Sequence, residues 1–305
     1  MDFSKKNYII FNENCMEKIK SFPEKSIDCI ITDPPYFIDG FDNKWDSGKI
    51  KNAKPNSHIK HLPKGMKFDK KQVKQLYDFY LEFSKLAYEK LKPGGFFLSF
   101  SSPRLYHALA MAVDIAGFEI RDSINWVYTQ SMPKGMKVSH IINKLNKDEK
   151  VKEDLKKEYE NFKTPQIKSC HEPICVGMKP IEKTFVNNEL NFKTGLLDFS
   201  TKVGSNSDKV IANVITTEEI NMTYDNNFLI SKVSKKEKGN INHPTMKPIE
   251  LIEHLVKIFS KKDSVVLDPF MGSGSTGVAC KNLDRKFIGI EIDNNYYNMS
   301  LKRLI

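Results

Sequence analysis

Short apolar runs alternate with stretches of helical apolar spacing along much of the chain. The runs predict strands near Tyr8, from Ser26, over residues 96–100, 118–128 and 173–178, from Val265, and over 287–292. Helical spacing predicts a short helix ending at Ile19 and longer helices over residues 70–91, 103–116 and 249–259. Because strands and helices alternate, we expect an α/β fold with a doubly wound, mostly parallel sheet.

The stretch from Ser26 to Tyr36 joins a buried strand to an acidic turn. Its apolar run suits a strand covered on both faces, and Asp33 follows at the carboxyl end. Pro34 and Pro35 lack backbone donors and stiffen the turn, so their carbonyls can accept hydrogen bonds beside the ring of Tyr36. Open α/β sheets bind ligands at this edge. The stretch therefore predicts a pocket for a planar group that carries an amine.

A glycine-rich loop follows the strand at Val265. Gly272, Gly274 and Gly277 fit the spacing G-x-G-x-x-G, and Glu291 ends the next strand, where a ribose-binding carboxylate belongs. The pattern therefore predicts a cofactor that contains a nucleoside. Asp268 just ahead of the loop would repel a pyrophosphate but attract an ammonium or a sulfonium. This charge favours S-adenosylmethionine over a nicotinamide cofactor.

Two polar regions interrupt the alternating pattern. Residues 39–69 lack periodicity, and we expect a mobile loop there. Residues 131–242 are interpreted as an insertion that contains one core strand near 173–178. A charged helix predicted over 138–162 is interpreted as a solvent-exposed face. The chain then divides into 1–130, the insertion 131–242, and 243–305.

The composition of the chain indicates what kind of partner it binds and in which compartment it works. The formal net charge of +10 and the pI near 9.1 favour a polyanionic partner, although only four of the 48 basic residues are arginine. Five scattered cysteines form no Cys-x-x-Cys pair, so we expect reduced thiols and no metal site. No apolar run is long enough to span a bilayer, and the amino terminus lacks a secretory pattern. We therefore expect a cytoplasmic protein that does not bind membranes.

Several stretches in fixed order resemble the β-class DNA amino-methyltransferases, which modify adenine N6 or cytosine N4. The similar stretches are 33–36 (Asp-Pro-Pro-Tyr), 91–95, 126–128, 171–174, 243–248 (His-Pro-Thr-Met-Lys-Pro), 268–274 and 287–291. The catalytic stretch comes first and the cofactor stretch last, as in that class. The resemblance implies a Rossmann-like methyltransferase fold in which 131–242 is the target-recognition region.

The same resemblance implies roles for single residues. It implies that Asp33 and the Pro34 carbonyl accept hydrogen bonds from the amine of a flipped base, and that Tyr36 stacks on the base; the catalytic set is Asp33, Pro34, Pro35 and Tyr36. The cofactor set implied by the motifs is Asn14, Cys15, Asp33, His243, Thr245, Lys247, Asp268, Phe270, Gly272, Ser273, Gly274, Ser275, Thr276, Glu291 and Ile292. Thr245, Lys247, Ser275 and Thr276 are expected at the methionine end of S-adenosylmethionine, Glu291 on the ribose and Ile292 against the adenine.

One position departs from the family pattern. Relatives often carry an acid before Cys15, whereas this chain has Asn14, which still forms hydrogen bonds. We expect cofactor binding to survive this change.

Two further hypotheses concern the polar regions. No arginine lies at 39–69 or 129–242, and arginine is the side chain that most often reads guanine. This absence favours a target rich in A·T pairs or one read by Lys, Asn and Gln. Trp45 is a candidate for a lid over the cofactor or the base, with an ordinary surface anchor as the alternative.

The interpretation favoured by the sequence is a site-specific adenine-N6 methyltransferase that acts on double-stranded DNA. Cytosine N4 stays open because both amines have the same geometry. A methyltransferase of RNA or of protein amides is less favoured because such enzymes usually carry Asn at the position of Asp33. A nicotinamide-dependent oxidoreductase would leave residues 33–36 unexplained. A homodimer and a cognate restriction endonuclease are partners that the sequence leaves open.

Overall fold

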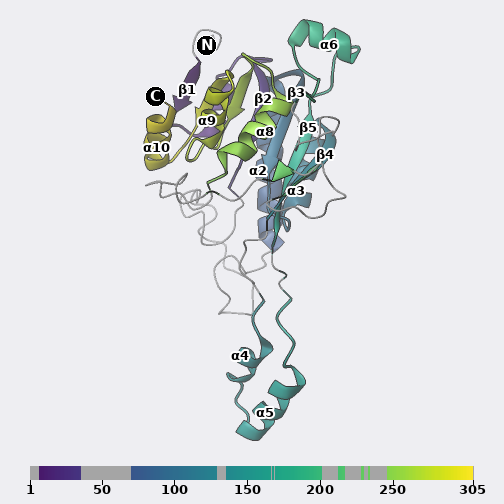
Figure 1. Ribbon diagram of the computed structural model, residues 1–305, viewed down its shortest axis with the longest axis vertical. Coiled ribbons are helices and arrows are strands. Elements are labelled where there is room, and N and C mark those ends of the chain that lie inside the picture. Colours follow the sequence, from purple (N-terminus) through teal and green to yellow (C-terminus); the bar gives the residue numbers. More distant parts are fainter. Residues whose placement is uncertain are drawn as a thin grey trace. The chain divides into compact units, whose positions relative to one another are not determined.

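The computed structural model describes residues 7–35, 70–128, 135–165, 167, 169–200, 212–216, 228–229, 233 and 246–304 of the chain (Figure 1). It divides into two compact units, one of Met1–Tyr128 with His171–Ile305 and the other of Thr129–Cys170. We call them the sheet unit and the helical unit. None of the described helices is long and apolar enough to cross a membrane.

In the described part of the chain, nine strands form one sheet in the order β1-β9-β8-β2-β3-β5-β4-β6-β7. The strands are β1 Tyr8–Phe11, β2 Ile27–Thr32, β3 Leu91–Phe100, β4 Glu119–Val127, β5 His171–Met178, β6 Val214–Thr216, β7 Phe228–Leu229, β8 Val265–Asp268 and β9 Lys286–Ile290. Of these, β5 runs antiparallel to its neighbours β3 and β4, and every other pair is parallel. The expected mostly parallel sheet is thus confirmed.

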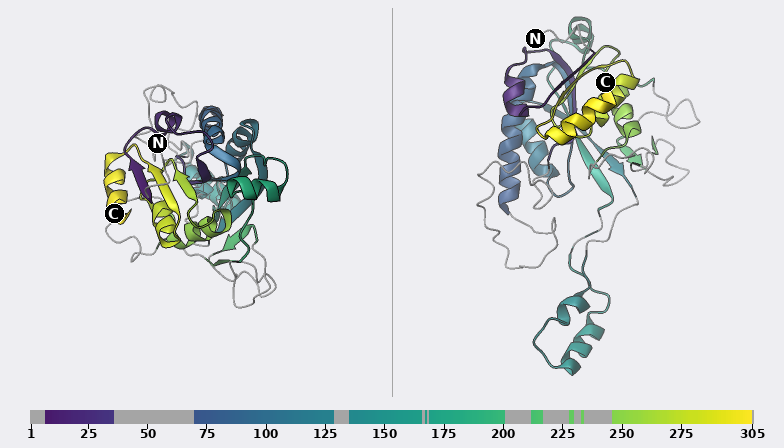
Figure 2. Two further views of the ribbon diagram at one scale, coloured as in Figure 1. Left: turned by 90° about the horizontal axis from the view of Figure 1, so that it is seen from above. Right: turned by 90° about the vertical axis from the view of Figure 1, so that its left-hand side faces the viewer.

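Helices cover both faces of this sheet (Figure 2). The helices of the sheet unit are α1 Cys15–Lys20, α2 Lys70–Lys90, α3 Tyr106–Ile115, α6 Phe185–Phe192, α8 Ile249–Phe259, α9 Ser275–Asn282 and α10 Asn294–Leu304. One buried cluster joins α1, α2 and α3 to the sheet, and a second joins α8, α9 and the end of α10 to its other face. The arrangement confirms the doubly wound α/β fold.

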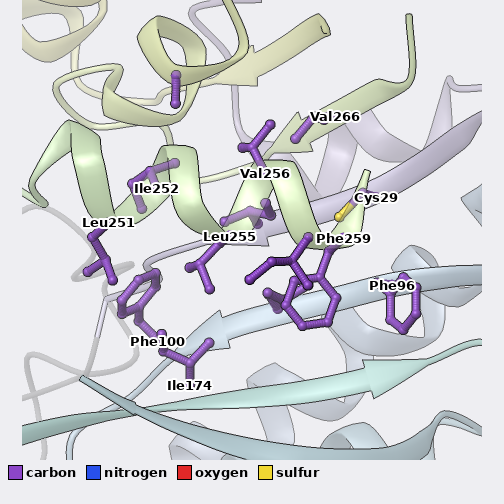
Figure 3. Close-up of a cluster of buried hydrophobic side chains, with 14 of the residues drawn as sticks. Cys29, Phe96, Phe100, Ile174, Leu251, Ile252, Leu255, Val256, Phe259 and Val266 are labelled. Carbon is purple, nitrogen blue, oxygen red and sulfur yellow. The ribbon is translucent and has the colours of Figure 1, made fainter. Parts of the chain in front are cut away.

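The two clusters follow from the alternation of side chains along each strand. On β2, Cys29 and Ile31 belong to the cluster under α8, whereas Ile30 belongs to the cluster under α2. Figure 3 shows Leu255 and Phe259 of α8 packed above β3 and β5. All of these residues are at most 7% exposed, so the central strands are buried on both faces.

The predicted helix over 70–91 and strand over 96–100 left the segment from Lys92 to Gly95 as a connection between them, but it lies within β3. The pairing of β2 with β3 jumps from Ile27↔Leu91 to Cys29↔Phe96, so the segment forms a bulge in the strand. Asn188 of α6, a helix the sequence did not predict, holds this bulge. Its Nδ2 donates to the carbonyls of Pro93 and Thr194, each at 3.0 Å, and its side chain is fully buried.

The helical unit contains α4 Val138–Ile142 and α5 Glu149–Glu158 instead of the single helix expected over 138–162. Its two ends pair through a bridge between Lys137 and Lys163, and the amide of Thr164 donates to the carbonyl of Met136 at 2.8 Å. Of the predicted insertion 131–242, residues up to 170 form this unit, whereas β5 and α6 lie in the sheet unit.

We expect Asn188→Ala to lower the free energy of unfolding by about 2 kcal/mol, because it leaves the carbonyls of Pro93 and Thr194 without the buried hydrogen bonds that Asn188 Nδ2 donates to them. Denaturant unfolding measures this loss. Asn191→Ala, on an exposed position of the same helix, is the matched control. Equal effects of the two substitutions would contradict the bracing role of Asn188.

Candidate active site

The acidic turn and the glycine loop lie side by side in the sheet. β2 pairs with β8 in parallel, with Cys29 opposite Val266 and Ile30 opposite Leu267. Asp33 directly follows β2, and Asp268 ends β8. The carboxyl ends of neighbouring parallel strands meet at one edge, so both acids stand where α/β sheets bind ligands.

Asp268 connects the two strand ends directly. Its Oδ1 accepts hydrogen bonds from Thr32 Oγ1 at 2.8 Å and from the amide of Phe270 at 3.1 Å, and its Oδ2 accepts one from Thr276 Oγ1 at 2.7 Å. The residue is 4% exposed. Burial raises the pKa of Asp268 to about 6, although the hydroxyls of Thr276 and Thr32 favour the charged form and oppose this rise.

Glu291 holds the glycine loop from the neighbouring strand. Its Oε2 accepts a hydrogen bond from the amide of Gly272 at 2.8 Å, and its Oε1 accepts one from the amide of Asp293 at 2.7 Å. Burial raises the pKa of Glu291, against the effect of these two amides. Gly274 has a φ of +79°, and a Cβ there would lie 3.0 Å from Ser300 Oγ. The loop therefore packs closely against α10, and glycine at position 274 permits this approach.

Lys247 reaches Asp33 from the segment before α8. Its ammonium forms an ion pair and a hydrogen bond with Asp33 Oδ2, lies 3.3 Å from Glu172 Oε2 and lies 4.9 Å from the centroid of the Phe100 ring. The Lys247 side chain is 8% exposed. Burial disfavours its charge, but Asp33 and Glu172 outweigh this effect and raise the pKa of Lys247 above its ordinary value.

Three predicted cofactor residues have structural contacts of their own. Asn14 is the N-cap of α1, where its Oδ1 accepts a hydrogen bond from the amide of Met16 at 2.8 Å. Cys15 is 2% exposed and lies near Glu291, and burial raises the pKa of its thiol to about 12. The ring of Phe270 packs in the core, with its centroid 5.3 Å from that of Phe83.

The remaining predicted residues of the glycine loop also lie at this edge. Ser275 Oγ donates to the carbonyl of Lys247 at 3.0 Å, which joins the start of α9 to the segment before α8. The carbonyl of Ser273 accepts a hydrogen bond from Arg303 at 2.6 Å. Ile292 is 41% exposed next to Glu291. Three predicted residues lie outside the described part of the chain, namely Tyr36, His243 and Thr245, as does Trp45.

Thr32, Phe100 and Glu172 contact this site but were not among the predicted site residues. Thr32 could have been noticed as the last strand residue before Asp33. Glu172 could have been noticed as an acid at the start of an apolar strand.

The acidic groups at this edge suit a ligand that carries positive charge. Asp268 and Glu291 are buried carboxylates whose charged forms are disfavoured by desolvation, and a cation placed nearby would stabilise those forms. A pyrophosphate would be repelled by the same groups. No cluster of His, Cys, Asp and Glu that could hold a metal ion occurs among the described residues, and all five cysteines are free thiols.

The helical unit carries a separate, basic pocket of about 490 Å³. It is lined by Gly135, Met136, Lys137, His140, Lys144 and Lys163. The three lysines and the histidine are exposed, and none of the lining residues is acidic. The pocket therefore suits an anionic ligand.

Comparison with protein families gives a match to the N6_N4_Mtase model, described as DNA methylase, over residues 27–302. Among similar proteins, the Type II methyltransferase M.HindIII of Haemophilus influenzae is 25% identical, with 97% of this chain and 94% of that protein covered. The Type II methyltransferase M2.LlaDCHI of Lactococcus lactis subsp. cremoris is 28% identical, with coverage of 99% and 91%.

Similar folds occur among solved structures. A complex of M1.HpyAVI with SAM has a TM-score of 0.56 at 23% identity, covering 97% of this chain and 98% of that one. The PvuII DNA methyltransferase, named as cytosine-N4-specific, has a TM-score of 0.61 at 19% identity, covering 98% and 87%. These structures support the Rossmann-like methyltransferase fold.

Substitution of Asp268 by Asn is expected to change how stability depends on pH. The pKa of Asp268 lies above its ordinary value of 3.8, so the stability it contributes is fully present below 3.8 and is lost as the pH rises through about 6. Between about pH 4 and pH 7, the free energy of unfolding of the unsubstituted protein should therefore fall relative to that of Asp268→Asn, by up to about 3 kcal/mol. Denaturant unfolding across this range tests the difference. Parallel pH profiles for the two proteins would refute it.

Proposed function

Because the chain belongs to the N6_N4_Mtase family of DNA methylases, we propose that it transfers a methyl group from S-adenosylmethionine to the N6 amine of adenine in double-stranded DNA. The observation that carries this proposal is the pairing of β2 with β8, which sets Asp33 beside the glycine loop. An amine held by Asp33 and a methyl donor held by the loop then share one edge of the sheet. The family assigns DNA methylation, and the choice of adenine N6 is part of the proposal.

Bound S-adenosylmethionine supplies an electrophilic methyl group on a positively charged sulfur. The acidic edge formed by Asp268 and Glu291 fits this charge, and Glu291 is assigned to the ribose hydroxyls. Gly272 and Gly274 have φ angles of +52° and +79°, which glycine adopts without strain, so the loop can turn at the end of β8. Ile292, exposed next to Glu291, is assigned to the face of the adenine ring.

Asp33 and the carbonyl of Pro34 are proposed to hold the target amine. Both are hydrogen-bond acceptors on a turn stiffened by two prolines. Acceptors on the amine hydrogens orient the nitrogen lone pair away from the ring plane and towards the methyl group, which lowers the barrier by positioning. As the nitrogen–carbon bond forms and the carbon–sulfur bond breaks, the nitrogen gains positive charge. A neighbouring carboxylate such as Asp33 stabilises that charge until a proton leaves.

The base must leave the duplex to reach this edge. Tyr36 is proposed to stack on the flipped base, as the family motif implies, and Pro35 fixes the turn that carries it. Thr245 is proposed at the methionine end of the cofactor on the same grounds, and His243 is proposed as a further cofactor contact.

Cytosine N4 is the second candidate for the methylated atom. It is supported by the likeness to the PvuII enzyme, whose name states that specificity. The acceptors at Asp33 and Pro34 would suit the exocyclic amine of either base. The chemistry of the transfer is the same for both.

Incubation of double-stranded DNA with labelled S-adenosylmethionine, followed by digestion and mass spectrometry, identifies the product. We expect the deoxynucleoside of N6-methyladenine. Detection of N4-methylcytosine would instead show that cytosine N4 is the methylated atom.

Asp33→Ala should lower the rate of transfer by at least about 10³-fold because the amine loses its acceptor, with cofactor affinity changed only a few-fold. Asp78→Asn, an exposed acid of α2, is the control. Full activity of Asp33→Ala would overturn the proposed site.

The region over 131–242 is proposed to recognise the DNA target, and the helical unit within it is proposed to bind the phosphate backbone. The support is the basic pocket, whose four cationic or titratable side chains match the charge of phosphates. The names of the Type II relatives support a place in a restriction–modification system, with a cognate endonuclease as a partner.

Replacing Lys137, Lys144 and Lys163 together by Gln should weaken binding to specific and non-specific duplexes alike. The slope of log affinity against log salt should become shallower by about 2 to 3, because three fewer phosphates are neutralised. The control replaces Lys147, Lys150 and Lys157, which are exposed in the same unit but lie outside the pocket. Fluorescence anisotropy at several salt concentrations measures both proteins. Equal losses in the two triple variants would contradict the role of the pocket.

A further inference from the structure

Glu172 enters the active site because β5 runs against its neighbours. The parallel strands β2 and β8 bring their last residues to the ligand edge, whereas an antiparallel strand brings its first residues there. Glu172 is the second residue of β5 and lies opposite Trp126 of β4. It thereby reaches the ammonium of Lys247, which also binds Asp33.

Lys247 is fixed from both ends. Its carbonyl accepts a hydrogen bond from Ser275 Oγ at the start of α9, and its side chain is buried against the ring of Phe100. The ammonium lies between two carboxylates, so the group of three carries a formal charge of −1. Without Glu172 the same group would be neutral, and Lys247 would offset the whole charge of Asp33.

Glu172 is partly buried, with 21% of its side chain exposed, and the described residues give its carboxylate few close partners. Among the described residues, its Oε2 is buried and has no hydrogen bond of normal geometry, although Lys247 lies 3.3 Å away. Its Oε1 lies 3.5 Å from the hydroxyl of Tyr128, which is the outer limit of a hydrogen bond. Burying an ion pair of this kind generally adds little to stability, because desolvation offsets the attraction. The arrangement is therefore better explained by a role in chemistry than by a role in folding.

We propose that Glu172 is a positioning residue for methyl transfer. It attracts the ammonium of Lys247, so that Lys247 neutralises only part of the charge of Asp33 and the site stays negatively charged. This inference rests on the proposed function. An amine that binds Asp33 must share that carboxylate with Lys247, so the hydrogen bond it receives depends on how strongly Lys247 is held elsewhere. The net negative charge also stabilises the positive charge that develops on the nitrogen.

The test compares Glu172→Gln, which keeps the shape and removes the charge, with Glu172→Asp, which keeps the charge on a shorter side chain. We expect Glu172→Gln to lower kcat by about 10-fold to 100-fold with KM for S-adenosylmethionine within about 2-fold, as for loss of one preorganised electrostatic contact. Glu172→Asp should recover part of kcat. The control is Glu182→Gln, which removes an exposed acid that is paired with Lys25 and follows the opposite end of β5.

The pH profile of kcat gives a second readout. Removing the negative charge of Glu172 makes the site less negative. A group in the site that must lose its proton before methyl transfer would then do so at lower pH, so the acid limb of the kcat profile should move to lower pH. Among the described residues, Asp268 of β8 and Tyr80 of α2 also interact electrostatically with Asp33, and Tyr128 faces Glu172; all three are unchanged in these variants.

Three results would overturn the inference. Unchanged kcat and an unchanged pH profile with a lower melting temperature would make Glu172 structural. A large rise in KM for S-adenosylmethionine at unchanged kcat would make it a cofactor contact. Equal effects of Glu172→Gln and Glu182→Gln on kcat would show that the loss comes from the change in net charge of the protein and not from the position of Glu172. If the unsubstituted protein methylates no DNA, the proposed function itself is wrong. If Asp33→Ala is inactive but Glu172→Gln is fully active, the proposed function stands and only the role of Glu172 is rejected.

Discussion

The hydrogen bonds of Asp268 are the constraint on which the site depends. A single buried carboxylate joins Thr32, next to the acidic turn, to Thr276 at the start of α9, residues that are more than two hundred positions apart. An unpaired carboxylate at this depth would be costly, and its three donors make the arrangement tolerable. Because all partners lie on regular elements or their ends, the distance between Asp33 and the glycine loop is set by the sheet itself.

Strand direction decides which side chains reach the site around Asp33 and Asp268. Parallel strands contribute the residues that follow them, as β2 contributes Asp33 and β8 ends in Asp268. The one reversed strand among those described contributes residues from its beginning instead. Lys247 is thus held between acids delivered by strands of opposite direction. A sheet with only parallel strands would have placed Glu172 at the opposite edge.

Acidic and basic side chains gather in different parts of the protein. The chain is basic overall, with a formal net charge of +10, yet the ligand edge of the sheet gathers Asp33, Asp268, Glu172 and Glu291. The basic pocket belongs to the helical unit. This division suits a reaction between a cationic methyl donor and a polyanionic substrate, because each ligand meets side chains of the opposite charge.

The sequence by itself determined the features that depend on neighbouring residues: the apolar runs of β2 and β8, the amphipathic α8, the glycine loop and the acidic turn at Asp33. Local signals were misleading where distant contacts outweigh them. Residues 92–95 carry the pattern of a helix stop, but pairing with β2 and hydrogen bonds from Asn188 place them in a strand bulge. The prediction that Lys247 lies at the methionine end of the cofactor stays a prediction, and only the fold shows that its ammonium lies between Asp33 and Glu172. Such contacts depend on strand order and direction, which arise from the burial of both sheet faces at once and are not encoded in any single stretch of the chain.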